Sequence, residues 1–223
     1  MTFVFDEDAG SSELVLKGES FKYLIKVRRH GVGDLLAFRQ REQPSTLHRY
    51  KLVAIDGRQA HLQLQESKMY EVKAGYPLHI GWCVIDSKSV EKVLPSLNEL
   101  GVTKITFIEC DRSQKNFKPD FKRYERILEG SMQQCGRTHK MVFETATNIA
   151  SFVKTNPDCA VFDFCETVYP DSDPYETVLI GAEGGFSDKE REIMQQQKVF
   201  RLDTAMILRS ETAAVAIASK ILL

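Results

Sequence analysis

Long apolar runs are missing from this chain of 223 residues. No stretch approaches the roughly eighteen consecutive apolar residues of a membrane-spanning helix. The first ten residues hold neither a basic segment nor an apolar one, so the sequence predicts no secretory signal and a cytoplasmic protein without membrane contact. Hydrophobic residues make up 43% and charged residues 27%, which is typical of globular proteins and excludes disordered or collagen-like chains.

Patterns typical of metal sites and of common enzyme classes are missing too. The five cysteines include no C-x-x-C pair, and the five histidines are scattered without ligand spacing. We therefore expect no metal, and we favour small buried cysteines in a reducing compartment over a disulfide framework. The nucleotide-binding motifs G-x-G-x-x-G and G-x-x-x-x-G-K-[ST] are missing, as is the hydrolase motif G-x-S-x-G.

The net charge of −1 gives no general reason to expect a nucleic-acid partner. The charge is uneven, however, because residues 17–58 hold ten lysines and arginines against four acids. The basic cluster in this stretch has two interpretations, an ordinary charged surface or contact with RNA phosphates. Its members are Lys22, Lys26, Arg28 and Arg29.

The first seventy residues are typical of a β-domain. Asp56-Gly57 between two apolar-polar runs predicts a hairpin, and a polar link from about residue 66 to 77 follows. We expect a small β-barrel or sandwich over residues 1–72. The predicted strands are 2–5, 13–16, 35–39, 49–55 and 59–65.

From about residue 78 onward, predicted strands and helices alternate. This alternation indicates a parallel sheet with helices on its faces, and we assign it to a second domain at residues 73–223. The predicted strands are 78–85, 104–108, 160–164, 177–181 and 199–202, and the predicted helices lie near 90–100 and 121–132, directly after Ser187, and over 211–223.

Residues 180–187, Ile-Gly-Ala-Glu-Gly-Gly-Phe-Ser, follow one predicted strand and lead into a helix with a capping-box sequence. Ligands of α/β sheets bind at the carboxyl ends of the strands, and glycines let the backbone approach a ligand closely. A tight strand-to-helix turn is the alternative interpretation. No lysine follows the glycines, so a ligand without a polyphosphate is favoured.

The apolar loop at 205–208 leads to Arg209, and Ser210 is the expected N-cap of the last helix. The loop is either a plain linker or the wall of a pocket for a flat aromatic ligand. Arg112 and Arg137 lie near other element ends. Each is either a solvated surface arginine or, with Arg209, part of an RNA-facing rim, since arginine suits phosphate oxygens.

Together these segments resemble the RsmE family, the small-subunit ribosomal RNA uridine N3-methyltransferases of the SPOUT superfamily. The order and spacing of the motifs agree with those of the family from about residue 78 to the end. The glycine loop and the Leu-Arg-Ser-Glu-Thr run are the motifs most specific to the family. A looser resemblance covers the basic residues 26–29 followed by 33–34. The matching segments are 98–102, 111–113, 134–137, 180–187 and 208–213.

The resemblance implies a SPOUT domain with a deep trefoil knot, preceded by a PUA-like β-barrel that binds RNA. It implies methylation at N3 of one uridine of 16S ribosomal RNA, position 1498 in the family target, on the assembled small ribosomal subunit, by a homodimer. The knot is expected to hold S-adenosyl-L-methionine. The implied cofactor-binding residues are Phe164, Cys165, Ile180, Gly181, Ala182, Glu183, Gly184, Gly185, Leu202, Ala205, Met206, Ile207, Leu208 and Arg209.

For the chemistry, Arg209 is our candidate catalytic residue. Uridine N3–H is a weak acid that must lose its proton before or during attack, and a nearby cation stabilises the negative charge that develops on the uracil oxygens. Glu183 and Glu211 are both open as the general base, and each is equally interpreted as a residue that braces a loop or caps a helix. The RNA-binding candidates are Lys22, Lys26, Arg28, Arg29, Arg112 and Arg137.

The sequence departs from the family at three positions. Thr2 lies where a terminal arginine is usual, Ser96 stands in place of a lysine, and Ala182 stands in place of a proline. The departures at Thr2 and Ser96 concern RNA contacts or the choice of target. The departure at Ala182 is expected to be tolerated, because alanine can adopt the backbone angle that proline fixes. The alternatives are a SPOUT methyltransferase for another ribosomal or transfer RNA nucleotide, a non-catalytic RNA-binding assembly factor, and a small-molecule α/β enzyme.

Overall fold

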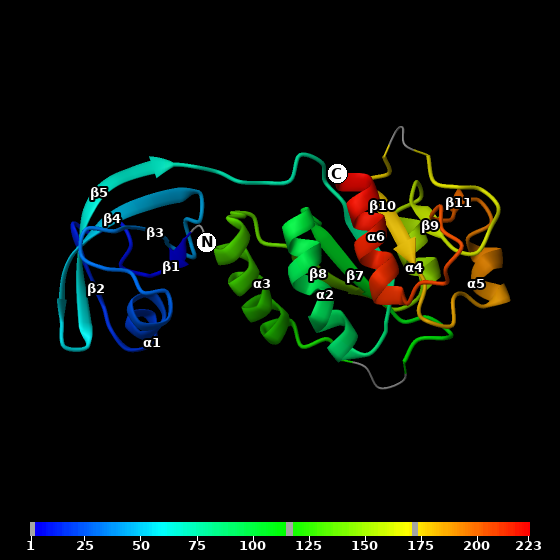
Figure 1. Ribbon diagram of the computed structural model, residues 1–223. Coiled ribbons are helices and arrows are strands. Elements are labelled where there is room, and N and C mark those ends of the chain that lie inside the picture. Colours follow the sequence, from blue (N-terminus) through cyan, green and yellow to red (C-terminus); the bar gives the residue numbers. More distant parts are fainter. Residues whose placement is uncertain (1–2, 115–117, 171–173) are drawn as a thin grey trace. The chain divides into compact units, whose positions relative to one another are not determined.

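A computed structural model describes residues 3–114, 118–170 and 174–223, so Thr2 lies outside the described residues. The chain divides into two compact units (Figure 1). One comprises Met1–Lys73 with Gln133–His139, and the other comprises Ala74–Met132 with Lys140–Leu223. No sequence signal indicates that residues 133–139 belong with the first unit. Within the described ranges, no helix is both long and apolar enough to cross a membrane.

The first unit is built on a curled five-stranded sheet that forms a half-barrel (Figure 1). The hairpin predicted at Asp56-Gly57 is confirmed, since Asp56 pairs with Gln59 and Gly57 has a φ of +56° in the two-residue turn. The fifth strand runs further than predicted, so the polar link is shorter. In spatial order the strands are β1 (Val4–Phe5), β3 (Leu35–Arg39), β4 (Thr46–Asp56), β5 (Gln59–Met69) and β2 (Glu13–Leu16).

A helical segment packs against this sheet where the sequence analysis placed none. It consists of α1 (Gly18–Phe21) and the π-helical turn η1 (Lys22–Val27). Its buried residues are Phe21, Leu24 and Ile25. Their i, i+3, i+4 spacing is the period of a helix, and the density of charges around it obscured that signal.

The second unit contains a six-stranded sheet whose strands are all parallel, as predicted. Two elements were not predicted: the strand β8 and the helix α4 (Ile149–Thr155), which follow one another in the chain. The spatial order of the strands is β11 (Val199–Phe200), β9 (Ala160–Phe162), β10 (Thr177–Ile180), β6 (His79–Cys83), β7 (Lys104–Ile108) and β8 (Val142–Ala146).

Helices cover both faces of this sheet (Figure 1). On one face, Trp82 of β6 donates a hydrogen bond to Ser210, the first residue of α6 (Ser210–Leu222), which also packs on α2 (Ser87–Leu100). On the other face, the small Gly81 lets the ring of Phe152 in α4 approach the strand closely. Because side chains alternate along a strand, neighbouring residues of β6 serve opposite layers. The remaining helices are α3 (Phe121–Cys135) and α5 (Asp188–Ile193).

The preference for small buried cysteines over disulfides is wrong for one pair. Cys83, at the end of β6, and Cys110, just after β7, form a disulfide with a Cα–Cα distance of 5.7 Å. The two strands are neighbours in the sheet, and Cys83 pairs in register with Ile108. The pairing therefore results from strand order, which the cysteine spacing along the chain does not indicate.

Candidate functional site

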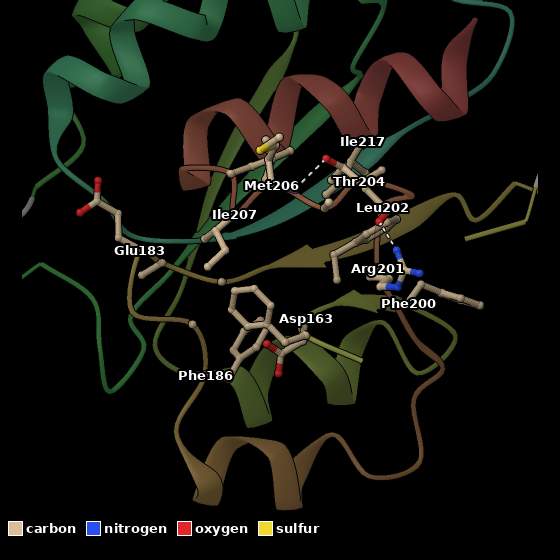
Figure 2. A pocket seen from close by; sticks show the side chains of 18 residues that line it. Asp163, Glu183, Phe186, Phe200, Arg201, Leu202, Thr204, Met206, Ile207 and Ile217 are labelled. Atoms are coloured by element: carbon tan, nitrogen blue, oxygen red, sulfur yellow. Dashed lines mark hydrogen bonds between the residues drawn. The ribbon is translucent and has the colours of Figure 1, made fainter. Parts of the chain in front are cut away.

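A cavity of about 250 Å³ lies at the carboxyl ends of β9, β10 and β11, the edge where the sequence analysis placed a ligand. Figure 2 shows it between the loop after β10 and the irregular segment that joins β11 to α6. The carboxyl ends of three parallel strands meet here, so loops from distant parts of the chain converge on one space.

Most of the predicted cofactor-binding residues lie around this cavity. The exceptions are Cys165, Ile180, Gly184 and Arg209, which do not line it. The predicted residues that do line it are Phe164, Gly181, Ala182, Glu183, Gly185, Leu202, Ala205, Met206, Ile207 and Leu208.

Eight further lining residues were not predicted. Phe186 directly follows the glycines and Phe162 ends β9, so the strand-end rule that selected their neighbours applies to them as well. Ala213 and Ile217 lie on α6, and no local pattern indicates that this helix forms part of the wall. The full set is Phe162, Asp163, Phe186, Phe200, Arg201, Thr204, Ala213 and Ile217.

The glycine loop is a tight turn with little room inside it. Gly185 has a φ of +66°, a conformation that favours glycine, and its N–H donates to the carbonyl of Ala182 at 2.9 Å. A Cβ added at Gly181 would lie 3.3 Å from the Cα of Gly185 and 3.4 Å from the ring of Phe186. The loop therefore serves both as a turn and as a wall of the cavity, so the two interpretations are compatible.

The base of the loop is fastened to α6. The Ser210 hydroxyl donates to the carbonyl oxygen of Gly181 at 2.6 Å and accepts from the indole N–H of Trp82 at 2.9 Å. Ser210 is thus not the N-cap that we predicted. Arg209 occupies that position, with φ −66° and ψ 154°, because the Ser210 side chain is committed to the loop.

Arg209 is exposed next to the cavity. In the described parts of the chain its guanidinium has no hydrogen-bonding or ionic partner, so it is available to a ligand. The adjacent loop is also exposed, with 73% of Met206 and 82% of Ile207 accessible. Figure 2 places both side chains at the cavity.

Asp163 is the buried carboxylate among the residues that line the cavity. Asp163 follows β9, and its oxygens accept from Arg191 of α5 at 2.8 and 3.4 Å. Its side chain is 7% exposed. The bonds to Asp163 raise the pKa of the Arg191 guanidinium above its usual value, so the arginine stays charged and compensates the buried carboxylate.

The two candidate bases differ in their surroundings. Glu183 is exposed and lines the cavity. Glu211 is buried in the first turn of α6 and does not line the cavity, and its Oε2 has no hydrogen-bond partner among the described residues. Glu183 therefore has the better access to a ligand.

All four basic residues of the N-terminal cluster are exposed on η1 and the residues after it. Arg28 stacks on the ring of Tyr23, with its Cζ 5.4 Å from the ring centroid, and donates to the Tyr23 hydroxyl at 3.0 Å. Arg29 has a φ of +61°, which is uncommon for a residue other than glycine. Lys22 and Lys26 complete the cluster.

The predicted arginine rim is only partly exposed. Arg112 is on the surface of the second unit and donates to the carbonyl of Gly184 at 2.5 Å. Arg137 belongs to the first unit, is 5% exposed and donates to the carbonyl of His139 at 2.6 Å. Arg137 is therefore buried and not the surface arginine that we expected, whereas its contact with RNA stays a prediction.

Metal-binding groups do not gather at the cavity or elsewhere in the described ranges. No set of three histidine, cysteine, aspartate or glutamate side chains among those residues lies close enough to hold an ion.

Several known proteins are similar to this chain in sequence. A family model described as an RNA methyltransferase domain matches residues 73–222. Two proteins from strains of Helicobacter pylori, each named ribosomal RNA small subunit methyltransferase E, are 36% and 35% identical over 98% of this chain and 98% of their own. A protein of the same name from Aquifex aeolicus is 30% identical over 60% of this chain and 63% of its own.

Solved structures share the fold. A putative methyltransferase from Legionella pneumophila, in complex with S-adenosylmethionine, has a TM-score of 0.74 at 21% identity. A ribosomal RNA small subunit methyltransferase E from Neisseria gonorrhoeae, bound to S-adenosylmethionine, has a TM-score of 0.75 at 15% identity. Each comparison covers 98% of this chain and 95% of the other.

Proposed function

Because this chain belongs to the RsmE family of RNA methyltransferases, we propose that it methylates N3 of one uridine in 16S ribosomal RNA. The methyl donor is S-adenosylmethionine, and the family target is uridine 1498, presented on the assembled small subunit. The observation that carries the proposal is the cavity at the carboxyl edge of the parallel sheet, beside an exposed Arg209 that has no side-chain partner among the described residues.

The cavity fits this methyl donor. S-adenosylmethionine carries no phosphate, and the glycine loop offers no lysine for one. The apolar walls, among them Leu202 and Ile207, suit the adenine ring, and the Asp163 carboxylate offers acceptors for hydroxyl or ammonium groups. The loops 181–185 and 202–208 would hold the donor. That these segments thread a trefoil knot remains a prediction.

Bound S-adenosylmethionine supplies a methyl group on a sulfonium, whose neutral thioether is a good leaving group. The protein's own contribution is alignment of uridine N3 and control of charge. The exposed guanidinium of Arg209 lies beside the cavity, and it stabilises the negative charge on the uracil oxygens once N3 is deprotonated.

Of the two carboxylates considered for the proton, we assign the role to Glu183, because it is exposed and lines the cavity. Glu183 accepts the N3 proton from a uridine that is unpaired, since a paired base keeps N3–H within its hydrogen bond. Glu211 is buried in the first turn of α6 and does not line the cavity, so it lacks access to the uridine.

RNA phosphates are the proposed partners of the exposed cations. These are Lys22, Lys26, Arg28 and Arg29 on the first unit and Arg112 on the second. Phosphate contacts of this kind position an RNA without reading its bases.

We also propose a homodimer. Phe164, Met206 and Ile207 at the cavity expose apolar side chains, and a second copy of the chain would cover them. Light scattering coupled to size exclusion gives the mass of a dimer for the wild type. Replacement of Ile207 by Glu shifts the mass toward a monomer, and a monomeric wild type refutes the assembly.

The function is tested with methyl-labelled S-adenosylmethionine and small ribosomal subunits that lack the modification. After digestion of the RNA, labelled 3-methyluridine from one site is expected. A labelled nucleoside of another kind, or label only in transfer RNA, assigns the enzyme a different target. Tight RNA binding without any transfer would identify a non-catalytic assembly factor.

A further inference from the structure

The loop at 181–187 is held at several points by residues outside it. At its base, Ser210 binds the carbonyl of Gly181. At its tip, Arg112 donates to the carbonyl of Gly184, and a Cβ at that glycine would lie 3.2 Å from the Arg112 Cδ. At its end, Ser187 is the N-cap of α5. The segment after β7, at residues 110–113, therefore packs directly on the glycine loop.

Glu190 of α5 joins these two segments through one buried carboxylate. Its Oε1 accepts from the backbone N–H of Asp111 at 2.8 Å, and its Oε2 accepts from the backbone N–H of Ser187 at 2.8 Å. The residue is 5% exposed. One segment follows β7 and the other follows β10, so the carboxylate bridges loops from two different strands.

The bridge is closed by two further bonds. The Ser187 hydroxyl donates to the Asp111 carboxylate at 2.5 Å and accepts from the backbone N–H of Glu190 at 3.3 Å. Asp111, Ser187 and Glu190 thus form a ring of four hydrogen bonds. The neighbouring Cys110 forms the disulfide with Cys83, the last residue of β6. The backbone next to Asp111 is therefore linked covalently to the sheet.

Only a carboxylate satisfies this arrangement. Two backbone N–H groups converge on one side chain, and each needs an acceptor because a buried donor without one is costly. Glutamine offers one oxygen, and its NH2 group would face the second N–H. A shorter aspartate has two acceptors but lacks the reach to both segments.

From this geometry we propose that Glu190 is a positioning residue, which keeps the glycine loop in the conformation that receives the methyl donor. The inference rests on the proposed function. Glu190 does not line the cavity, so it acts through the loop and not by contact with the donor. The same ring couples the exposed Arg112 to the loop, since Arg112 follows Asp111 directly.

The test compares Glu190→Gln with Glu192→Gln, an exposed carboxylate on the same helix, so the change of charge is matched. In the protein without donor, hydrogen exchange is measured peptide by peptide. We expect E190Q to accelerate exchange at residues 183–187 and at Asp111, with other peptides unchanged. Calorimetry with S-adenosylmethionine should give about a 10-fold higher Kd, in line with the loss of a buried hydrogen bond.

Kinetics distinguish positioning from chemistry and from folding. For E190Q the KM for S-adenosylmethionine rises in parallel with the Kd, and kcat at saturating donor stays within about 2-fold of the wild type. A normal Kd with slower turnover overturns the inference, as does unchanged hydrogen exchange. If E190Q does not fold, Glu190→Asp, which keeps the charge but lacks the reach to both segments, decides in the same two assays. A wild type that binds no S-adenosylmethionine refutes the proposed function. Hydrogen exchange in the protein without donor still shows whether Glu190 holds the two loops together.

Discussion

At the scale of single residues, the proposed chemistry depends most on Arg209. The backbone places it at the N-cap of α6 with its side chain exposed, while the neighbouring Ser210 bonds to the glycine loop. We expect Arg209→Ala to lower kcat by about 100-fold, the usual effect of removing a group that stabilises an oxyanion. Methyl transfer to small subunits is the measurement.

The same variant also tests whether Arg209 acts in binding. The Kd for S-adenosylmethionine should change little, because Arg209 does not line the cavity. Arg126→Ala, an exposed arginine on α3, is the control and should transfer methyl groups at the wild-type rate. Full turnover in R209A would mean that another group stabilises the uracil charge.

His79, at the start of β6, predicts a dependence of stability on pH. Burial, and secondarily the charge of Lys104, lower the pKa of His79 from its ordinary 6.5 to about 4, and its Nε2 lies 2.8 Å from the Thr106 hydroxyl. The unfolded chain takes up this proton near pH 6.5, whereas the folded chain resists it until about pH 4. The contribution to stability is therefore complete above pH 6.5 and is lost as the pH falls toward 4.

Urea unfolding between pH 7 and pH 5 measures this contribution, above the range where most carboxylates titrate. The free energy of unfolding of the wild type should fall over this interval more steeply than that of His79→Gln. Equal slopes for the two proteins would show that His79 titrates normally in the folded state.

At the scale of elements, β6 and α4 approach each other closely at Gly81. A Cβ at Gly81 would overlap the ring of Phe152, which is buried on α4. We expect Gly81→Ala to destabilise the protein by about 2 kcal/mol, the usual cost of overpacking a core. Denaturant unfolding provides the value.

A double mutant shows whether this contact is the cause. Phe152→Leu makes room for the added methyl group, so the loss in G81A/F152L should be smaller than the sum of the two single losses. Additive losses would place the strain elsewhere.

At the scale of the whole molecule, the disulfide restricts the unfolded chain. Cys83 and Cys110 close a loop with a sequence separation of 27. Its reduction should lower the free energy of unfolding by about 3 kcal/mol, since the unfolded chain gains freedom. Thermal unfolding with and without dithiothreitol measures the effect.

The variant that lacks both cysteines provides the control. Cys83→Ala with Cys110→Ala should unfold like the reduced wild type and should not respond to dithiothreitol. A mass spectrum of the untreated protein that shows both thiols free would contradict the bond.

The sequence by itself determined the elements with strong local patterns. The helix that ends at Gly101, the hairpin at Asp56-Gly57 and the capped turn after Ser187 all follow from short-range periodicity and turn chemistry. These features depend on neighbours within about one helical turn, which is the range that a pattern in the chain can report. Most of the cavity lining was accessible in the same way, because the ends of parallel strands share one edge.

Only the tertiary structure decided which distant residues meet. Trp82 and Ser210 bond across a separation of 128, Glu190 and Asp111 across 79, and Arg191 and Asp163 across 28. The order of the strands in the sheet determines these pairings, as it determines the disulfide. It also placed residues 133–139 in the first unit and enclosed Arg137 there. The burial of a side chain and its bonding partners depend on the order of the strands. A residue's type and its neighbours along the chain do not indicate that order.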